Sequence, residues 1–236
     1  MRRLRSALLL LALAPLVSGA PARAQVLIGY LFGEKLSTPD FNMGFEVGAN
    51  FSTVTGFDDA QRTSRTAFGL FADWRYSEHF HLGGAVLPFA GRGAGNLAPE
   101  PTGDAAFDNQ TAGHRMERSF DYVEISALMK WAPKREEGIR FGAGPSLGIV
   151  TGARDRYDAV TPSGTPYTLE RDLGGKVPGV DFGLSVEAEW RFPLLSIAAR
   201  YTQGLTDMRA DGAPDPSYTR VLTGTGRIYL GKKASP

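Results

Sequence analysis

A strictly alternating run of side chains between Gly179 and Arg191 constrains the fold more than any other part of the chain. Apolar side chains occupy the even-numbered positions from Val180 to Trp190, and small or charged ones occupy the odd-numbered positions from Asp181 onward. Alternation with period two is typical of a β-strand whose two faces meet different surroundings. At ~3.3 Å per residue the run reaches about 43 Å, enough to cross a bilayer at a tilt. The run therefore predicts a strand with lipid on one face and a polar lumen on the other.

The beginning of the chain has the features of a secretory signal peptide. A positively charged start precedes an apolar run over residues 7–17, and an A-x-A cleavage site follows at residues 22–24. We therefore expect residues 1–24 to be a cleaved signal peptide that directs export. Residues 25–40 are expected to form an N-terminal periplasmic segment, whose apolar stretch fits either a short helix or a strand, and residues 41–236 an outer-membrane β-barrel.

Eight segments of the mature chain alternate between apolar and polar residues. An even number of such strands is typical of bacterial outer-membrane barrels. The pattern predicts an all-β fold: a single eight-stranded antiparallel up-and-down transmembrane β-barrel. We expect its strands at residues 44–54, 67–76, 80–90, 122–131, 139–150, 179–191, 195–205 and 220–231.

The connections between these segments alternate in length. Tight links at residues 77–79, 133–138 and 192–194 are expected to be periplasmic turns. The longer polar connections are expected to be extracellular loops, because outer-membrane barrels have short periplasmic turns and longer outer loops. They cover residues 55–66, 91–119, 151–178 and 206–219. Four aromatic residues beside the tight links predict a girdle at the membrane interface: Trp74, Tyr76, Trp131 and Trp190.

Composition narrows the class of protein. The net charge is +1 without a basic block, so nothing indicates a nucleic-acid partner. The mean hydropathy is −0.18, far below that of a helical membrane protein but compatible with a barrel that places lipid-facing residues at every second position. The chain has no cysteine and 29 glycines, and glycine is tolerated in tightly curved small barrels.

The chain resembles the PorT-like family of bacterial outer-membrane β-barrels over roughly residues 30–231. The resemblance rests on four short glycine-rich motifs in their order and spacing, at residues 41–52, 121–126, 141–145 and 181–184. It implies an eight-stranded antiparallel barrel with no established common activity. The chain departs from such barrels at its end, where an aromatic residue is common but residues 231–236 here follow Leu230.

Twelve charged side chains fall on the expected inward faces of the strands. The interior of an eight-stranded barrel is just wide enough for side chains to fill, and buried charges are costly unless paired. We therefore predict a salt-bridged plug, with a narrow polar pore or small-solute site as the alternative. The predicted network is Glu46, Asp73, Arg75, Glu124, Lys130, Arg140, Asp181, Glu187, Glu189, Arg191, Arg200 and Arg227. Gly142, Gly144 and Gly148 share one face and are expected to make room for bulky neighbours across the lumen.

Three groups of polar residues are candidates for chemical sites. His79 and His81 have a metal-like spacing on a strand, but we interpret them as turn histidines near the headgroups. A hydrolase site built from His114, Ser119 and Asp121 has no supporting spacing. Acidic loop pairs are compatible with a divalent cation or with loop solubility: Asp58 with Asp59, and Asp155 with Asp158.

The sequence thus predicts a monomeric integral protein of the bacterial outer membrane with a structural or surface-interaction role. Its expected partners are outer-membrane lipid, lipopolysaccharide and one protein partner, either extracellular or periplasmic. We expect no enzyme activity, no cofactor and no metal, because no motif brings a nucleophile and a base together. Two alternatives stay open: a narrow small-solute channel, and a soluble, lipocalin-like periplasmic binding barrel whose apolar face would line the cavity.

Overall fold

The computed structural model describes residues 38, 40–100, 105–111, 114–133, 137–160, 164–209 and 215–230. The expected signal peptide at 1–24, most of the segment 25–40 and the residues after Leu230 lie outside the described residues. Among the described residues no helix has the length and hydropathy to span a bilayer.

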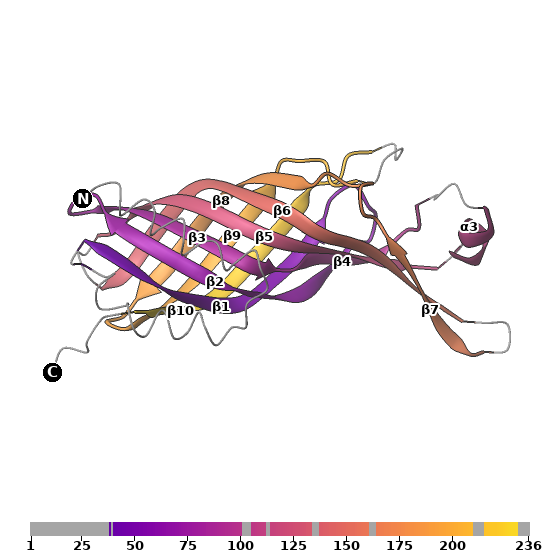
Figure 1. The fold of residues 1–236 in the computed structure, drawn as a ribbon, viewed down its shortest axis with the longest axis horizontal. Coiled ribbons are helices and arrows are strands. Elements are labelled where there is room, and N and C mark those ends of the chain that lie inside the picture. The colour runs from indigo at the N-terminus through magenta and orange to yellow at the C-terminus, as the bar shows by residue number, and fades with distance from the viewer. Residues whose placement is uncertain are drawn as a thin grey trace, which may run out of the picture.

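Eight described strands form a closed antiparallel barrel (Figure 1). The last strand pairs with the first, in register from Gly44 opposite Tyr229 to Val54 opposite Thr219, so the sheet has no open edge along this seam. This confirms the predicted fold class. The barrel strands are β1 (Phe41–Val54), β2 (Gln61–Arg75), β3 (Phe80–Ala90), β5 (Met116–Trp131), β6 (Gly138–Val160), β8 (Val180–Arg191), β9 (Leu195–Gly204) and β10 (Thr219–Tyr229).

Two regions predicted as loops contain regular structure instead. In residues 91–119, strand β4 (Arg92–Leu97) pairs with both β2 and β5, and the short helix α3 (Ala105–Thr111) follows it. In residues 151–178, β6 runs on to Val160 and forms a hairpin with β7 (Pro166–Asp172). Figure 1 shows this hairpin and α3 beyond the barrel at the end opposite the short turns.

β-bulges explain why these extensions were missed. The register of β2 with β3 shifts between Phe68 and Leu70, beside Pro88, and that of β5 with β6 shifts between Asp121 and Tyr122. A bulge inserts an extra residue and changes which residues face inward, so the alternation appears to end although the strand continues. Proline within a sheet is itself typical of bulges and edges.

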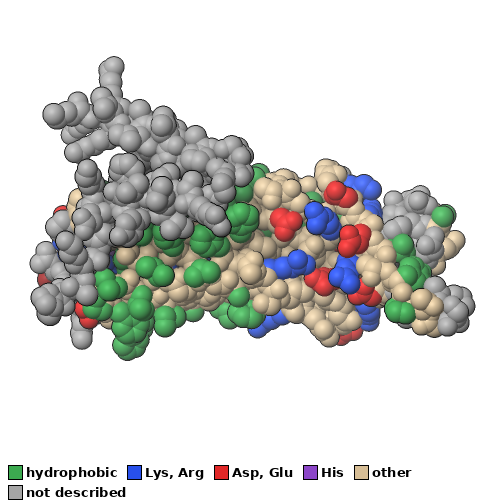
Figure 2. All heavy atoms as spheres, turned by 60° about the horizontal axis from the view of Figure 1, so that its bottom comes forward, with side chains coloured by type: hydrophobic (Ala, Val, Ile, Leu, Met, Phe, Trp, Pro, Cys, Tyr) green, Lys and Arg blue, Asp and Glu red, His purple; other side chains and the backbone are tan. Residues whose placement is uncertain are grey.

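The outer wall is apolar along the half of the barrel that ends in the short turns. On β8, Phe182, Leu184 and Val186 are exposed, whereas Glu187 is buried, as is Arg200 on β9. Figure 2 shows hydrophobic side chains over this part of the wall, and charged ones gathered toward the other end. This orientation excludes the lipocalin-like alternative, which requires the apolar face inside.

The predicted aromatic girdle lies on the outer surface beside the short turns. Its members are 44–72% exposed, and Trp74 contacts Tyr76 edge to face with ring centroids 6.4 Å apart. Trp190 stacks on Phe192 at the same centroid distance. Aromatic rings of this kind are enriched at membrane–water interfaces, so the girdle indicates the periplasmic boundary of the bilayer.

Arginine scanning along the outside of β8 tests this membrane placement. Val186→Arg lies near the middle of the apolar band and should cost about 2–4 kcal/mol of unfolding free energy, whereas Val180→Arg near its extracellular end should cost about 0–1 kcal/mol. Urea unfolding of both variants in phospholipid vesicles measures the difference. Equal costs at the two positions would contradict the proposed depth.

Candidate functional site: the barrel interior

The membrane half of the lumen is filled by charged side chains. All members of the predicted network except Arg75 are buried, with 0–4% of each residue exposed. They alternate inward from β1, β2, β5, β6, β8, β9 and β10, because each strand turns every second residue toward the lumen.

The middle of the lumen holds a cluster of two carboxylates and two guanidinium groups. Arg227 donates from Nε to Glu46 at 3.0 Å and from Nη2 to Glu187 at 2.7 Å. Arg200 donates to the same two carboxylates, at 3.2 Å to Glu46 and 2.9 Å to Glu187. Glu46 and Arg227 are also directly opposite each other across the β1–β10 seam. Each group thus meets two opposite charges, which buried ions require to offset their loss of hydration.

Arg92 on β4 holds the extracellular end of this network. Its guanidinium lies 2.6 Å from Glu124 and 3.0 Å from Asp181, and over the Tyr122 ring at 4.6 Å. A Cβ at Gly148 would lie 2.6 Å from that ring, so this glycine does make room for a bulky luminal neighbour, as predicted. Sequence reasoning missed Arg92 because it placed the residue in a loop. The one sequence feature that could have indicated its inward position is Pro88, which marks a β-bulge and not the end of the strand.

Lys130 organises the periplasmic end of the lumen. Its Nζ lies 2.9 Å from Asp73, 2.9 Å from Glu189 and 3.1 Å from Glu187. Arg140 is 3.9 Å from Asp73 at the nearest.

Two predicted members of the network make other contacts. The Arg191 guanidinium lies over the Tyr229 ring at 4.3 Å and forms no ion pair with a described carboxylate. Arg75 does not join the luminal network, contrary to the prediction. It is the last residue of β2, and there it pairs with the exposed Asp40 at the rim.

An apolar core fills the lumen beyond the membrane half. The buried side chains come from the upper ends of the strands and from the loops above them. This filling was not predicted, since most of these residues lie in segments expected to be loops. The cluster comprises Val54, Ala67, Leu87, Ala90, Ala94, Leu97, Met116, Phe120, Tyr122, Ala153, Tyr157, Leu173 and Met208.

A second group of ion pairs lies at the same level as this core, where Arg118 is buried between Met116 and Phe120. Arg118 donates to Asp155 at 2.7 Å and to Glu100 at 2.6 Å, and Glu100 also accepts from Arg209 at 2.9 Å. Arg209 lies over the Phe57 ring at 4.1 Å. Burial by itself would lower the pKa of the Arg118 guanidinium, but the hydrogen bonds and charges of Asp155 and Glu100 outweigh it and raise that pKa. The pairing ties together four extracellular segments.

The remaining sequence candidates do not converge on a chemical site. His79 lies exposed in a turn, 3.2 Å from the Ala132 carbonyl oxygen, while His81 is buried on the luminal face of β3. The interpretation of both as turn histidines was therefore wrong for His81. Within the described ranges no group of three or more His, Asp or Glu residues could hold a metal ion.

The loop candidates are engaged in other contacts. The Ser119 hydroxyl lies 3.5 Å from the Arg154 carbonyl oxygen, and among the described residues it forms no hydrogen bond with His114 or Asp121. Asp155 is buried against Arg118, whereas Asp158 is exposed and accepts from Thr168 at 3.1 Å, so these two acids do not form a pair.

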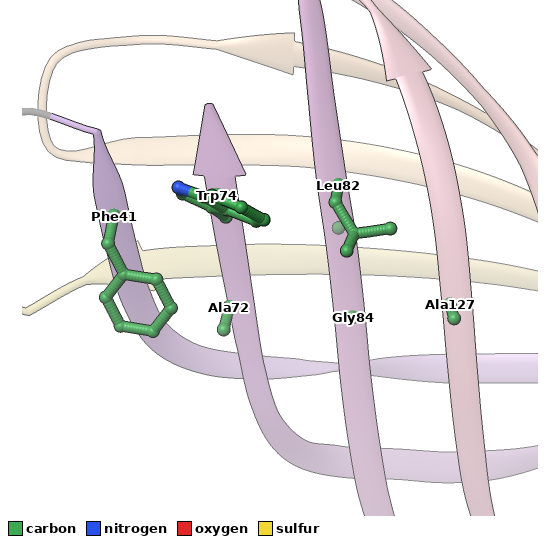
Figure 3. A pocket seen from close by; sticks show the side chains of 7 residues that line it. Phe41, Ala72, Trp74, Leu82, Gly84 and Ala127 are labelled. Carbon is green, nitrogen blue, oxygen red and sulfur yellow. The ribbon is translucent and has the colours of Figure 1, made fainter. Parts of the chain in front are cut away.

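The outer wall carries a shallow apolar depression near the girdle. Figure 3 shows Phe41, Trp74 and Leu82 around a floor of Ala72, Gly84 and Ala127, contributed by β1, β2, β3 and β5. It lies within the lipid-facing band, and the Trp74 indole nitrogen is the one polar side-chain group among its lining residues.

A family model for the outer membrane protein beta-barrel domain matches residues 28–209 of this chain. The chain belongs to this outer membrane protein beta-barrel family. Membership agrees with the apolar outer wall and assigns the chain to the bacterial outer membrane. The PorT-like subtype stays a prediction.

Solved outer-membrane barrels are similar to this family member in outline. The attachment invasion locus protein Ail of Yersinia pestis, in complex with the heparin analogue sucrose octasulfate, is 12% identical over 81% of this chain and 99% of its own, with a TM-score of 0.43. Neisserial surface protein A is 10% identical over 80% and 96%, with a TM-score of 0.37. OprG of Pseudomonas aeruginosa is 13% identical over 80% and 91%, with a TM-score of 0.31. No curated protein matches the sequence significantly.

Breaking the central cluster should destabilise the barrel strongly. Arg227→Met leaves Glu46 and Glu187 each with one cation fewer inside the lumen, and the loss of one partner of a buried pair typically costs about 3–5 kcal/mol. Urea unfolding in detergent micelles measures this cost. The matched control is Arg75→Met at the rim, where the partner Asp40 is exposed to water and the loss should stay within about 1 kcal/mol. Similar costs for the two variants would show that luminal pairing is not decisive.

Proposed function

We propose that this outer-membrane barrel is a closed, non-conducting body that supports an interaction surface outside the cell. The observation that carries the proposal is the double filling of its lumen: paired charges in the membrane half, and an apolar core beyond it. A solute path would have to pass through both.

The chemistry of each layer supports closure. A hydrated ion entering the membrane half would have to separate pairs such as Arg92 with Glu124, and leaving a buried charge unpaired is costly. In the outer half the same path meets Leu97, Met116 and Phe120, which are fully buried and offer a permeating ion no ligand. An eight-stranded barrel leaves little room beside such side chains.

The part of the barrel beyond the membrane supports a surface role. The wall continues there as β4, the first half of β5 and the β6–β7 hairpin, and charged side chains lie on the outer side of the hairpin and of β5. Arg154, Arg156, Asp158 and Glu170 are exposed on the hairpin. Rigid strands that carry exposed charged groups present a fixed pattern to a partner, which favours specific recognition over a flexible loop.

The membrane partners we propose are lipid and lipopolysaccharide along the apolar band.

Planar bilayer recordings test closure directly. The purified wild-type chain should insert without producing discrete conductance steps, because both layers block the lumen. Gel mobility before and after heating verifies that the inserted protein is folded. Reproducible unitary currents that change on Arg200→Gln would instead support the small-solute channel.

Shortening the β6–β7 hairpin tests the surface role. Residues 158–168 are replaced by Asn-Gly, which favours a tight hairpin turn and retains the register pair Tyr157 and Leu169 at the apolar core. We expect normal barrel folding and a loss of adhesion or aggregation of cells that display the protein. A Glu78→Gln variant in a periplasmic turn serves as the matched control. Unchanged behaviour of the shortened variant in these cell assays would count against a surface role for the hairpin.

A further inference from the structure

We propose that the periplasmic end of the lumen binds one small inorganic anion, held by Arg191 with Ser196 and His81 as further hydrogen-bonding groups. This site goes beyond the proposed function, since a closed barrel can exist with or without it.

The distribution of charge along the lumen is the first argument. The buried luminal set, with Arg92 in place of Arg75, contains six acids and six bases, but they are not spread evenly. Around the central and upper clusters lie four carboxylates and three guanidinium groups: Glu46, Glu124, Asp181 and Glu187 with Arg92, Arg200 and Arg227. The periplasmic end therefore keeps two acids, Asp73 and Glu189, against three bases, Lys130, Arg140 and Arg191.

Arg191 is the basic residue of this end that has no carboxylate partner among the described residues. Lys130 forms ion pairs with both Asp73 and Glu189. Glu189 also contacts Arg227 at 3.2 Å and the Tyr229 hydroxyl at 2.8 Å. Among the described residues Arg191 has only the Tyr229 ring, although it is 3% exposed. A guanidinium so buried and without a counter-charge is costly, and an anion would remove that cost.

Unsatisfied polar atoms gather at the same level of the barrel. The Nε of Arg191, the hydroxyl of Ser196 and both ring nitrogens of His81 are buried without a hydrogen-bond partner among the described residues. Arg191 and Ser196 are opposite each other on β8 and β9, and both Arg191 and Arg140 act electrostatically on His81. Buried polar groups normally have hydrogen-bond partners, so several unsatisfied polar atoms at the periplasmic end of the lumen indicate a bound ligand.

The position of these groups fixes the direction of entry and the kind of ligand. Arg191 ends β8, while Ser196 and His81 are each the second residue of their strands, so all three lie at the short-turn end. The pairs around Lys130 and Arg227 close the lumen above them. The ligand must therefore enter from the periplasm and be small, and guanidinium and hydroxyl donors suit chloride or an oxyanion such as sulfate or phosphate.

Anion titration of the full mature chain in zwitterionic detergent tests the site. The background is sodium gluconate at constant ionic strength, and chloride, sulfate and phosphate are added separately in radiolabelled form. Equilibrium dialysis should give saturable binding near one equivalent per chain for at least one of the three anions. The same anion should raise the thermal unfolding midpoint, because a ligand of the folded state stabilises it. The comparison of the three anions identifies whether a halide or an oxyanion is preferred.

Two variants localise the binding. Arg191→Gln should weaken it about tenfold or more, because a charge-assisted hydrogen bond is lost, and Ser196→Ala should weaken it less. Arg75→Gln, at the rim of the same opening, should bind as the wild type does. In gluconate alone, Arg191→Gln should unfold at or above the wild-type midpoint, because it removes an uncompensated buried charge. Absence of saturable binding with all three anions, or unchanged affinity in Arg191→Gln, would overturn the proposal.

Discussion

The pairing of charges inside a narrow barrel is the constraint on which the rest of the structure depends. Lipid on the outside forces apolar side chains to one face of each strand, and the alternation of the backbone sends the polar ones inward. Backbone hydrogen bonds join only neighbouring strands. The ion pairs instead cross the lumen, as Arg200 on β9 does to Glu124 on β5 and Arg92 on β4 does to Asp181 on β8. The network thus braces strands that the sheet itself does not connect.

Strand β5 shows where the membrane environment ends. From Lys130 to Glu124 its inner face is mostly polar and its outer face carries Met129 and Ile125. Beyond Tyr122 the same alternation continues, but the inner face now carries Phe120 and Met116 on either side of the ion-paired Arg118, and Glu117 is on the outer face. The strand becomes an ordinary soluble one without changing its geometry, so a single element carries both the anchor and its extracellular support.

The membrane-spanning strands and most of the luminal charges could be predicted, because the alternation of odd and even positions along a strand assigns each side chain to the lumen or to the lipid. This assignment fails across a β-bulge. On β3 the buried positions are odd from His81 to Leu87 and become even at Ala90. The next even position, Arg92 at the start of β4, is buried too, so the shift hid the guanidinium that completes the upper cluster. On β6 the buried positions change from even to odd after the register shift near Val150, which hid Asp155. The position of the extra residue in a strand cannot be predicted from the sequence of that strand alone, since a bulge depends on the pairing with the partner strand.

The pair formed by Glu46 and Arg227 joins the first strand to the last, at the seam where the sheet closes. While the two ends of the sheet are apart, Glu46 on β1 lacks both of its cations, Arg227 on β10 and Arg200 on β9. Closure of the barrel and neutralisation of the charges in its lumen therefore occur together. An open, half-assembled sheet in the bilayer carries an electrostatic penalty that only full closure removes, which makes assembly of this barrel cooperative and its reopening unfavourable.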